Sequence, residues 1–153
     1  MSTLVRILYL LALIVWLGEV LFLSFVVAPA MFRTFAVEEA GRAVGTLFPI
    51  YYKIGYGAGA VMLVTALALR GLAGGRAWAL IAGLVAVMLA ATLYAGVVVE
   101  PRARALRPEL HAASAPPVKE EFDQLHRRAV QLNAVVLLGG IVVAVISALQ
   151  LRP

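Results

Sequence analysis

The chain contains no cysteine, only two histidines, and few charged residues, which make up 14% of the sequence. Without cysteine it can form no disulfides, thiolate metal sites, iron–sulfur clusters or covalently attached c-type haem. With 63% hydrophobic residues, the 153-residue chain also lies outside the composition of ordinary soluble domains. We therefore expect an integral membrane protein whose main partner is the lipid bilayer.

Four apolar runs are long enough to cross a hydrocarbon core about 30 Å thick at about 1.5 Å per residue. They predict transmembrane helices at residues 5–32, 47–69, 77–100 and 128–151. The rest of the chain is too short for a soluble domain, so residues 1–153 are expected to form a single transmembrane domain. The predicted fold class is all-α: a polytopic membrane protein with an antiparallel bundle of four transmembrane helices.

The first two connections differ in character. Residues 33–46 place apolar side chains on helical spacing with charged ones between them, which predicts a short amphipathic segment after the first helix. Pro49 then favours a kink near the start of the second span. The glycine-rich stretch 70–76 predicts a tight turn, which makes the second and third spans antiparallel neighbours.

The long connection before the fourth span holds most of the charge. Glu100 and Pro101 predict an end or a kink of the third span. From Val118 the apolar spacing is helical again, so we expect the fourth helix to have an extension that projects into the cytosol or periplasm. The net charge of +5 is typical of membrane-flanking charge that meets anionic lipid, and no nucleic-acid partner is expected.

Four spans place both termini and the glycine turn on one side of the membrane. The side with the long connections carries more Arg and Lys in total, so the positive-inside rule predicts that both termini lie outside the cytoplasm. The side with the termini is as basic for its length, which keeps the opposite orientation open.

Polar residues inside the spans gather in the half of the bundle nearest the long connections. Counting about 1.5 Å per residue places most of them at a depth of about 10 to 20 Å. Glu100 and His126 lie nearer the surface. A polar half-bundle of this kind can bind an ion, a proton or a polar ligand, because hydrocarbon solvates none of these. The candidate binding residues are Glu19, Lys53, Tyr94, Asn133, Glu100 and His126.

Glu19 is central because it lies in the otherwise uncharged run 7–32. It can be a neutral acid that is hydrogen-bonded to Asn133, a tyrosine or a carbonyl and holds helices together. It can instead be a proton or cation site, paired with Lys53 or joined by Glu100 and His126. A contact between subunits of an oligomer is the third interpretation.

Metal and haem chemistry have less support. Glu19, Glu100 and His126 are the candidate metal ligands, but their spacing matches no diagnostic pattern. A bis-histidine haem would need His111, which lies in a proline-broken loop, although a single axial histidine stays open. No cofactor is predicted. No nucleophile stands near a histidine in a recognisable motif, and no phosphate-binding glycine loop is present, so we expect no enzyme activity.

Gly55 and Gly59 form a GxxxG pattern in the second span. Small residues at this spacing let helices approach closely. The pattern therefore marks either the seam of a homo-oligomer or packing within one chain.

Several short motifs, in order, resemble one known family. They are Trp16-Leu17-Gly18, Phe25-Val26-Val27-Ala28-Pro29, Met31-Phe32, Ala40-Gly41-Arg42, Leu47-Phe48-Pro49, Tyr51-Tyr52, Gly55, Phe122, Leu125-His126-Arg127-Arg128 and Asn133. Together they resemble the four-helix family of transmembrane protein 205, also described as domain of unknown function 4149. The resemblance implies an architecture rather than an activity, since the family has no established biochemical function; a eukaryotic member is associated with resistance to platinum drugs.

The Trp16-Leu17-Gly18 stretch is also similar, more distantly, to copper-resistance D-type and related haem-handling membrane proteins. Those proteins normally have a histidine in the first helix, where this chain has Glu19 and no histidine. The departure weighs against copper or haem. An arginine-rich, lysine-poor composition suits a bacterium with a GC-rich genome, which would place the chain in the inner membrane.

The leading functional hypothesis is a small membrane protein that binds or conducts a small cation, a proton or a polar solute around Glu19. The first alternative is a non-catalytic accessory or scaffold subunit of a larger membrane complex. The second alternative is a haem- or metal-binding membrane protein.

Overall fold

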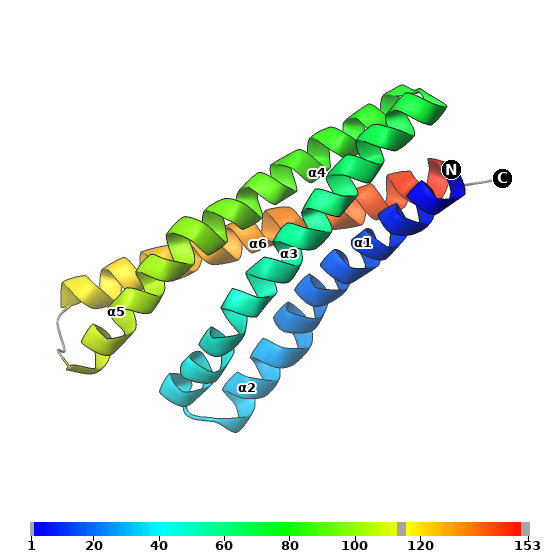
Figure 1. The fold of residues 1–153 in the computed structure, drawn as a ribbon. Helices are drawn as coiled ribbons and strands as arrows, with labels where there is room; N and C mark the ends of the chain where they lie inside the picture. The colour runs from blue at the N-terminus through cyan, green and yellow to red at the C-terminus, as the bar shows by residue number, and fades with distance from the viewer. Residues whose placement is uncertain (1, 113–115, 151–153) are drawn as a thin grey trace.

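The computed structural model describes residues 2–112 and 116–150, and within these residues it contains helices and short turns but no strand (Figure 1). Four helical stretches are long and apolar enough to cross a membrane: Thr3–Thr34, Val37–Ala73, Arg76–Leu110 and Pro116–Gln150. The predicted all-α fold with four membrane-spanning helices is confirmed. The elements are α1 (Ser2–Phe22), the π-helical turn η1 (Leu23–Val27), α2 (Ala28–Thr34), α3 (Val37–Ala73), α4 (Arg76–Tyr94), the π-helical turn η2 (Ala95–Val99), α5 (Glu100–Ala112) and α6 (Pro116–Gln150).

The four long helices form a closed antiparallel bundle. α1 packs on α3, α3 on α4, α4 on α6, and α6 again on α1. The start of α1, the end of α6 and the turn between α3 and α4 lie at one end of the bundle (Figure 1). At the other end the α2–α3 corner and the α5–α6 corner stand apart (Figure 1).

The turn between α3 and α4 depends on two glycines. Gly74 and Gly75 both have positive φ angles, of 69° and 95°. This conformation is strained for residues that carry a Cβ atom, whereas glycine adopts it freely. The glycine-rich stretch therefore makes the tight antiparallel turn that the sequence predicts.

The segment after the first span leads directly into the second span. α2 continues the first helix to Thr34, and α3 begins at Val37. Pro49 lies inside α3 without ending it. Residues 37–46 are thus the first turns of a helix long enough to extend beyond the hydrocarbon core, since its 37 residues span about 55 Å at 1.5 Å each.

The third span continues beyond Glu100 and Pro101, so the predicted end at this point is wrong, while the alternative of a kink stays a prediction. The reason lies one turn earlier, because η2 has π geometry and the backbone N–H of Glu100 donates to the carbonyl of Ala95. A proline lacks an N–H and clashes with the carbonyl four residues before it, and a π turn relieves both problems. Most of the long connection is consequently helical, as α5 and the projecting start of α6.

Apolar side chains fill the interior of the bundle and also cover its outer surface, as in membrane proteins. Trp16, Met62, Ile81 and Val143 are almost fully buried between the helices. Large apolar side chains cover the outside, where for example Leu138 is 63% exposed. An apolar exterior over four helices of spanning length is what a lipid environment requires. The protein is therefore a small integral membrane protein.

Candidate functional site

Glu19 projects from α1 into the bundle, where both oxygens of its carboxylate are buried. Neither oxygen has a hydrogen-bond partner within the part of the chain that the structure describes. Of the alternatives that the sequence left open, the hydrogen bond to Asn133, a tyrosine or a carbonyl and the ion pair with Lys53 are not formed among the described residues. A charged carboxylate without a partner is costly in an apolar interior, so this group is the chemical anomaly of the bundle.

The space around this carboxylate comes from a missing side chain. A Cβ atom placed on Gly55 of α3 would lie 3.1 Å from Glu19 Oε1, 3.1 Å from the Thr92 methyl carbon and 3.3 Å from Trp16 Nε1. Glycine at position 55 thus lets α3 approach closely, with the acid, the indole and the Thr92 side chain all pressed against its backbone. We call this group of four residues the Glu19 pocket.

A hydrogen-bonded chain of polar side chains lies beside the pocket. The Tyr51 hydroxyl donates to Asn133 Oδ1 at 2.6 Å, and Asn133 Nδ2 donates to Ser24 Oγ at 3.0 Å. These contacts connect α3, α6 and η1. Tyr51 is also within electrostatic range of the Glu19 carboxylate. Asn133 therefore joins three helices, as interhelical polar groups in membranes do, while Glu19 stays outside the chain of bonds.

A small cavity of about 10 Å³ lies between α3, α4 and α6, next to Tyr51 and Asn133. Its polar lining comes from the side chains of Tyr51, Tyr52, Thr92 and Asn133. A volume of this size holds about one water molecule, which needs polar partners of the kind present here. The cavity shares Thr92 with the Glu19 pocket, but Glu19 itself does not line it.

Glu100 forms a second polar centre, nearer the end where the corners diverge. Arg104, one turn along α5, donates to Glu100 Oε1 from Nε at 2.8 Å and from Nη2 at 2.6 Å. Tyr52, Tyr56 and Arg107 lie within electrostatic range of the same carboxylate. Glu100 is thus 9% exposed but paired within its own helix, unlike Glu19.

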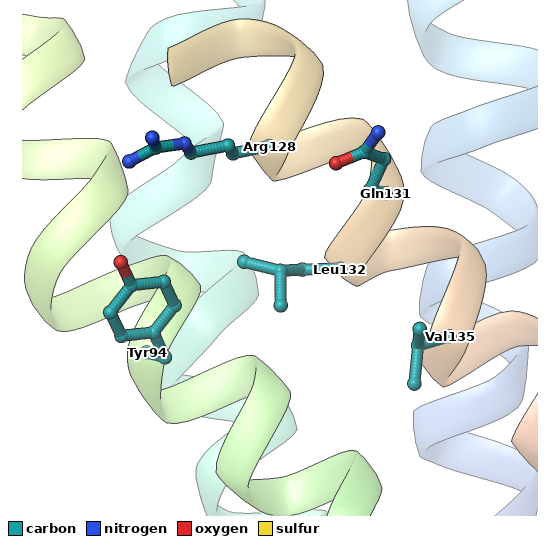
Figure 2. Close-up of a pocket in the computed structure, with 5 residues that line it drawn as sticks. All are labelled: Tyr94, Arg128, Gln131, Leu132 and Val135. Atoms are coloured by element: carbon teal, nitrogen blue, oxygen red, sulfur yellow. The ribbon is translucent and has the colours of Figure 1, made fainter. Parts of the chain in front are cut away.

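The other predicted residues lie on the outside. Lys53 is exposed on α3. His126 is exposed on α6 and stacks on Phe122, with ring centroids 6.4 Å apart. Tyr94 is 46% exposed and lines an outer groove (Figure 2). They therefore do not join Glu19 in a polar half-bundle.

A family model described as a domain of unknown function (DUF4149) matches residues 11–112. The chain belongs to this family. The match includes every residue of the Glu19 pocket but stops before α6, which carries Asn133. No curated protein and no solved structure matches the chain.

The candidate metal ligands of this DUF4149 protein are not gathered. Glu19, Glu100 and His126 occupy three separate environments, and no group of three or more His, Asp or Glu residues among those described is arranged to hold a metal ion. The side chain of His111 lies outside the described residues.

The GxxxG pattern of the DUF4149 chain packs inside the bundle. Gly55 faces the Glu19 pocket, and a Cβ atom on Gly59 would lie 2.8 Å from Leu89 Cδ1 and 2.9 Å from Trp16 Cη2. Both glycines are buried. Both glycines therefore pack against other helices of the same chain. They do not lie on the outer surface, where an oligomer seam would need them.

Several residues of the site were not among those predicted. Trp16 and Tyr51 were missed because aromatic residues in a membrane helix serve equally well as packing or interfacial groups. A usable signal exists in hindsight, since Trp16 lies three residues before Glu19 and Tyr51 four before Gly55, each on a shared helix face. Ser24 carries no such signal, because its direction depends on the π turn η1.

Proposed function

We propose that this membrane protein binds a proton at Glu19 and passes it across the bilayer. One observation supports the proposal: both oxygens of the Glu19 carboxylate are buried without a hydrogen-bond partner. A bound proton makes the group neutral and removes the cost of an isolated charge in a low-dielectric interior. Groups of this kind in transmembrane helices commonly serve as proton relays.

The size of the neighbouring cavity favours a proton over a larger cargo. A volume of about 10 Å³ accommodates a single water molecule but no polar solute. A bound metal cation would need several oxygen ligands, whereas Glu19 supplies the only carboxylate of its pocket among the described residues. Tyr51, Thr92 and Asn133 line the cavity and carry polar groups that are suitable hydrogen-bonding partners for one water molecule.

Proton flux into liposomes tests the proposal. Purified protein is reconstituted with a pH-sensitive dye inside the vesicles, and a potassium gradient with valinomycin drives proton entry. We expect Glu19→Gln, which keeps the shape of the side chain but cannot release a proton, to reduce flux to that of empty vesicles. Glu38→Gln is the matched control, because Glu38 is an exposed carboxylate in the first turn of α3. Normal flux through folded Glu19→Gln protein would remove the proposal.

Infrared spectroscopy separates a proton from a cation at the same residue. A protonated Glu19 gives a carboxylic-acid carbonyl band that disappears in Glu19→Gln and is insensitive to sodium or potassium. A carboxylate band that shifts when either salt is added would instead indicate cation binding.

The second candidate function is that of a non-catalytic accessory subunit in a larger membrane complex. It is favoured by the small volume of the cavity between α3, α4 and α6, since about 10 Å³ is little room for transport. This function predicts no flux for the wild-type protein and co-purification with other membrane proteins after mild solubilisation. A stable isolated assembly that carries flux would contradict it.

The proposed setting is a bacterial inner membrane with both termini outside the cytoplasm, as a single chain or a homo-oligomer without enzyme activity. The narrower likeness to transmembrane protein 205 belongs to the same proposal, and the distant likeness to copper-resistance D-type proteins adds a haem- or metal-binding alternative. A visible spectrum and metal analysis of purified protein test that alternative directly.

A further inference from the structure

A groove on the outside of the bundle is separate from the Glu19 pocket. It lies between α4 and α6 and has a volume of about 310 Å³. Tyr94 of α4 lines one wall, while the other lining residues, Arg128, Gln131, Leu132 and Val135, come from α6 (Figure 2). A volume near 300 Å³ is at the lower end of the range for sites that bind small organic molecules.

The lining of the groove changes from polar to apolar along α6. Arg128 is the last charged residue before the uncharged stretch 129–151, so it marks the level at which the helix enters the apolar layer. Leu132 and Val135 lie about 6 and 10 Å deeper, at about 1.5 Å per residue. Figure 2 shows the Tyr94 hydroxyl pointing toward the part of the groove where Arg128 lies. The groove thus has a polar end near the surface and an apolar end within the membrane.

Arg128 has no acidic partner within residues 2–112 and 116–150. Arg104, by contrast, pairs with Glu100. An exposed arginine at the edge of the hydrocarbon layer faces lipid headgroups, and its planar guanidinium group matches the oxygens of a phosphate. The charge at this end of the groove is therefore complementary to an anionic headgroup.

We propose that the groove binds one anionic phospholipid. The phosphate lies at Arg128, the Tyr94 hydroxyl and the Gln131 amide donate to headgroup oxygens, and an acyl chain follows Leu132 and Val135. Along the membrane normal the groove is first polar and then apolar, as a phospholipid has its headgroup at the surface and its acyl chains below. The proposal uses different residues from the Glu19 pocket, so it stands whether or not a proton binds there.

Lipid binding by the full-length protein tests the proposal. The protein is titrated in neutral detergent micelles with phosphatidylglycerol or phosphatidylcholine, and bound lipid is counted by native mass spectrometry. We expect one preferred phosphatidylglycerol, bound about fivefold more weakly by Arg128→Gln, as the loss of about 1 kcal/mol for one arginine implies. Arg127→Gln is the matched control, because Arg127 is exposed on the same helix but does not line the groove.

A second variant acts without a change of charge. Val135→Trp fills the apolar end of the groove and is expected to displace the lipid while Arg128 stays in place. Excess inorganic phosphate should leave the lipid bound, because it lacks the acyl chain that occupies this end.

Four results would overturn the proposal. Binding that survives both Arg128→Gln and Val135→Trp shows that the groove is not the site. An equal loss in Arg127→Gln indicates diffuse surface charge, and equal binding of phosphatidylcholine removes the anionic headgroup. If a Val135→Cys variant forms a cross-linked dimer without bound lipid, the groove is instead an interface with a second copy of the chain.

Discussion

Gly59→Ala tests the close approach of α3 to its neighbours. The added methyl carbon would lie 2.8 Å from Leu89 Cδ1 and 2.9 Å from Trp16 Cη2. Carbon atoms in contact prefer separations of about 3.5 to 4.0 Å, so the methyl group overlaps both by more than half an ångström. Trp16 is 1% exposed and packs within the core cluster, so its rigid ring moves only if neighbouring side chains move. Overpacking of this kind costs about 1 to 3 kcal/mol of unfolding free energy.

Gly57→Ala is the matched control, because a Cβ atom there meets nothing within 4 Å. Both substitutions replace a helical glycine and share the same gain in helix propensity, about 1 kcal/mol, so this gain cancels in the comparison. We therefore expect Gly59→Ala to be less stable than Gly57→Ala by about 1 to 3 kcal/mol. Unfolding by SDS in mixed micelles, followed by far-ultraviolet circular dichroism, gives the two free energies. Equal values would refute the packing of Trp16 over Gly59.

Two further substitutions test the polar contacts of the interior. Tyr51→Phe removes the donor to Asn133 and should lower the unfolding free energy by about 0.6 to 1.7 kcal/mol, the range for interhelical hydrogen bonds in membranes; Tyr94→Phe, on the exposed groove, should change it little in the same SDS titration. Lys53→Gln should leave the proton flux that depends on Glu19 unchanged, because Lys53 is exposed and does not pair with the acid; a loss of flux in liposomes would reconnect the two residues.

The spans and the glycine turn could be predicted because they depend on local properties of the chain. A long apolar run needs only its length to be recognised, and Gly74 and Gly75 adopt backbone angles that favour glycine. The continuation of the third span beyond Pro101 could not be predicted in the same way. It depends on a π turn that forms before the proline, and a proline alone does not determine whether a helix ends, kinks or forms a π turn.

The partners of the polar residues were harder to predict for a different reason. In a soluble helix the polar face identifies the side that points outward, but in a membrane helix both faces are apolar and the rotation about the axis leaves little trace. The sequence therefore predicts a similar depth for Lys53, Asn133 and Glu19 but not the direction of each side chain. The structure turns Lys53 outward and Asn133 toward Tyr51.

The π turn η1 changes which face of the first transmembrane helix points into the bundle before and after it. Ala28 N–H donates to the carbonyl of Leu23, five residues back, so η1 holds about one residue more than an α-helical turn does. One residue corresponds to about 100° of rotation in an α-helix. The inward face of α1, defined by Tyr9, Trp16 and Val20, therefore cannot be extended by simple counting into α2. Loss of one residue from η1 would restore an α-helical turn and rotate the α2 corner relative to the core, with the lengths of the helices almost unchanged.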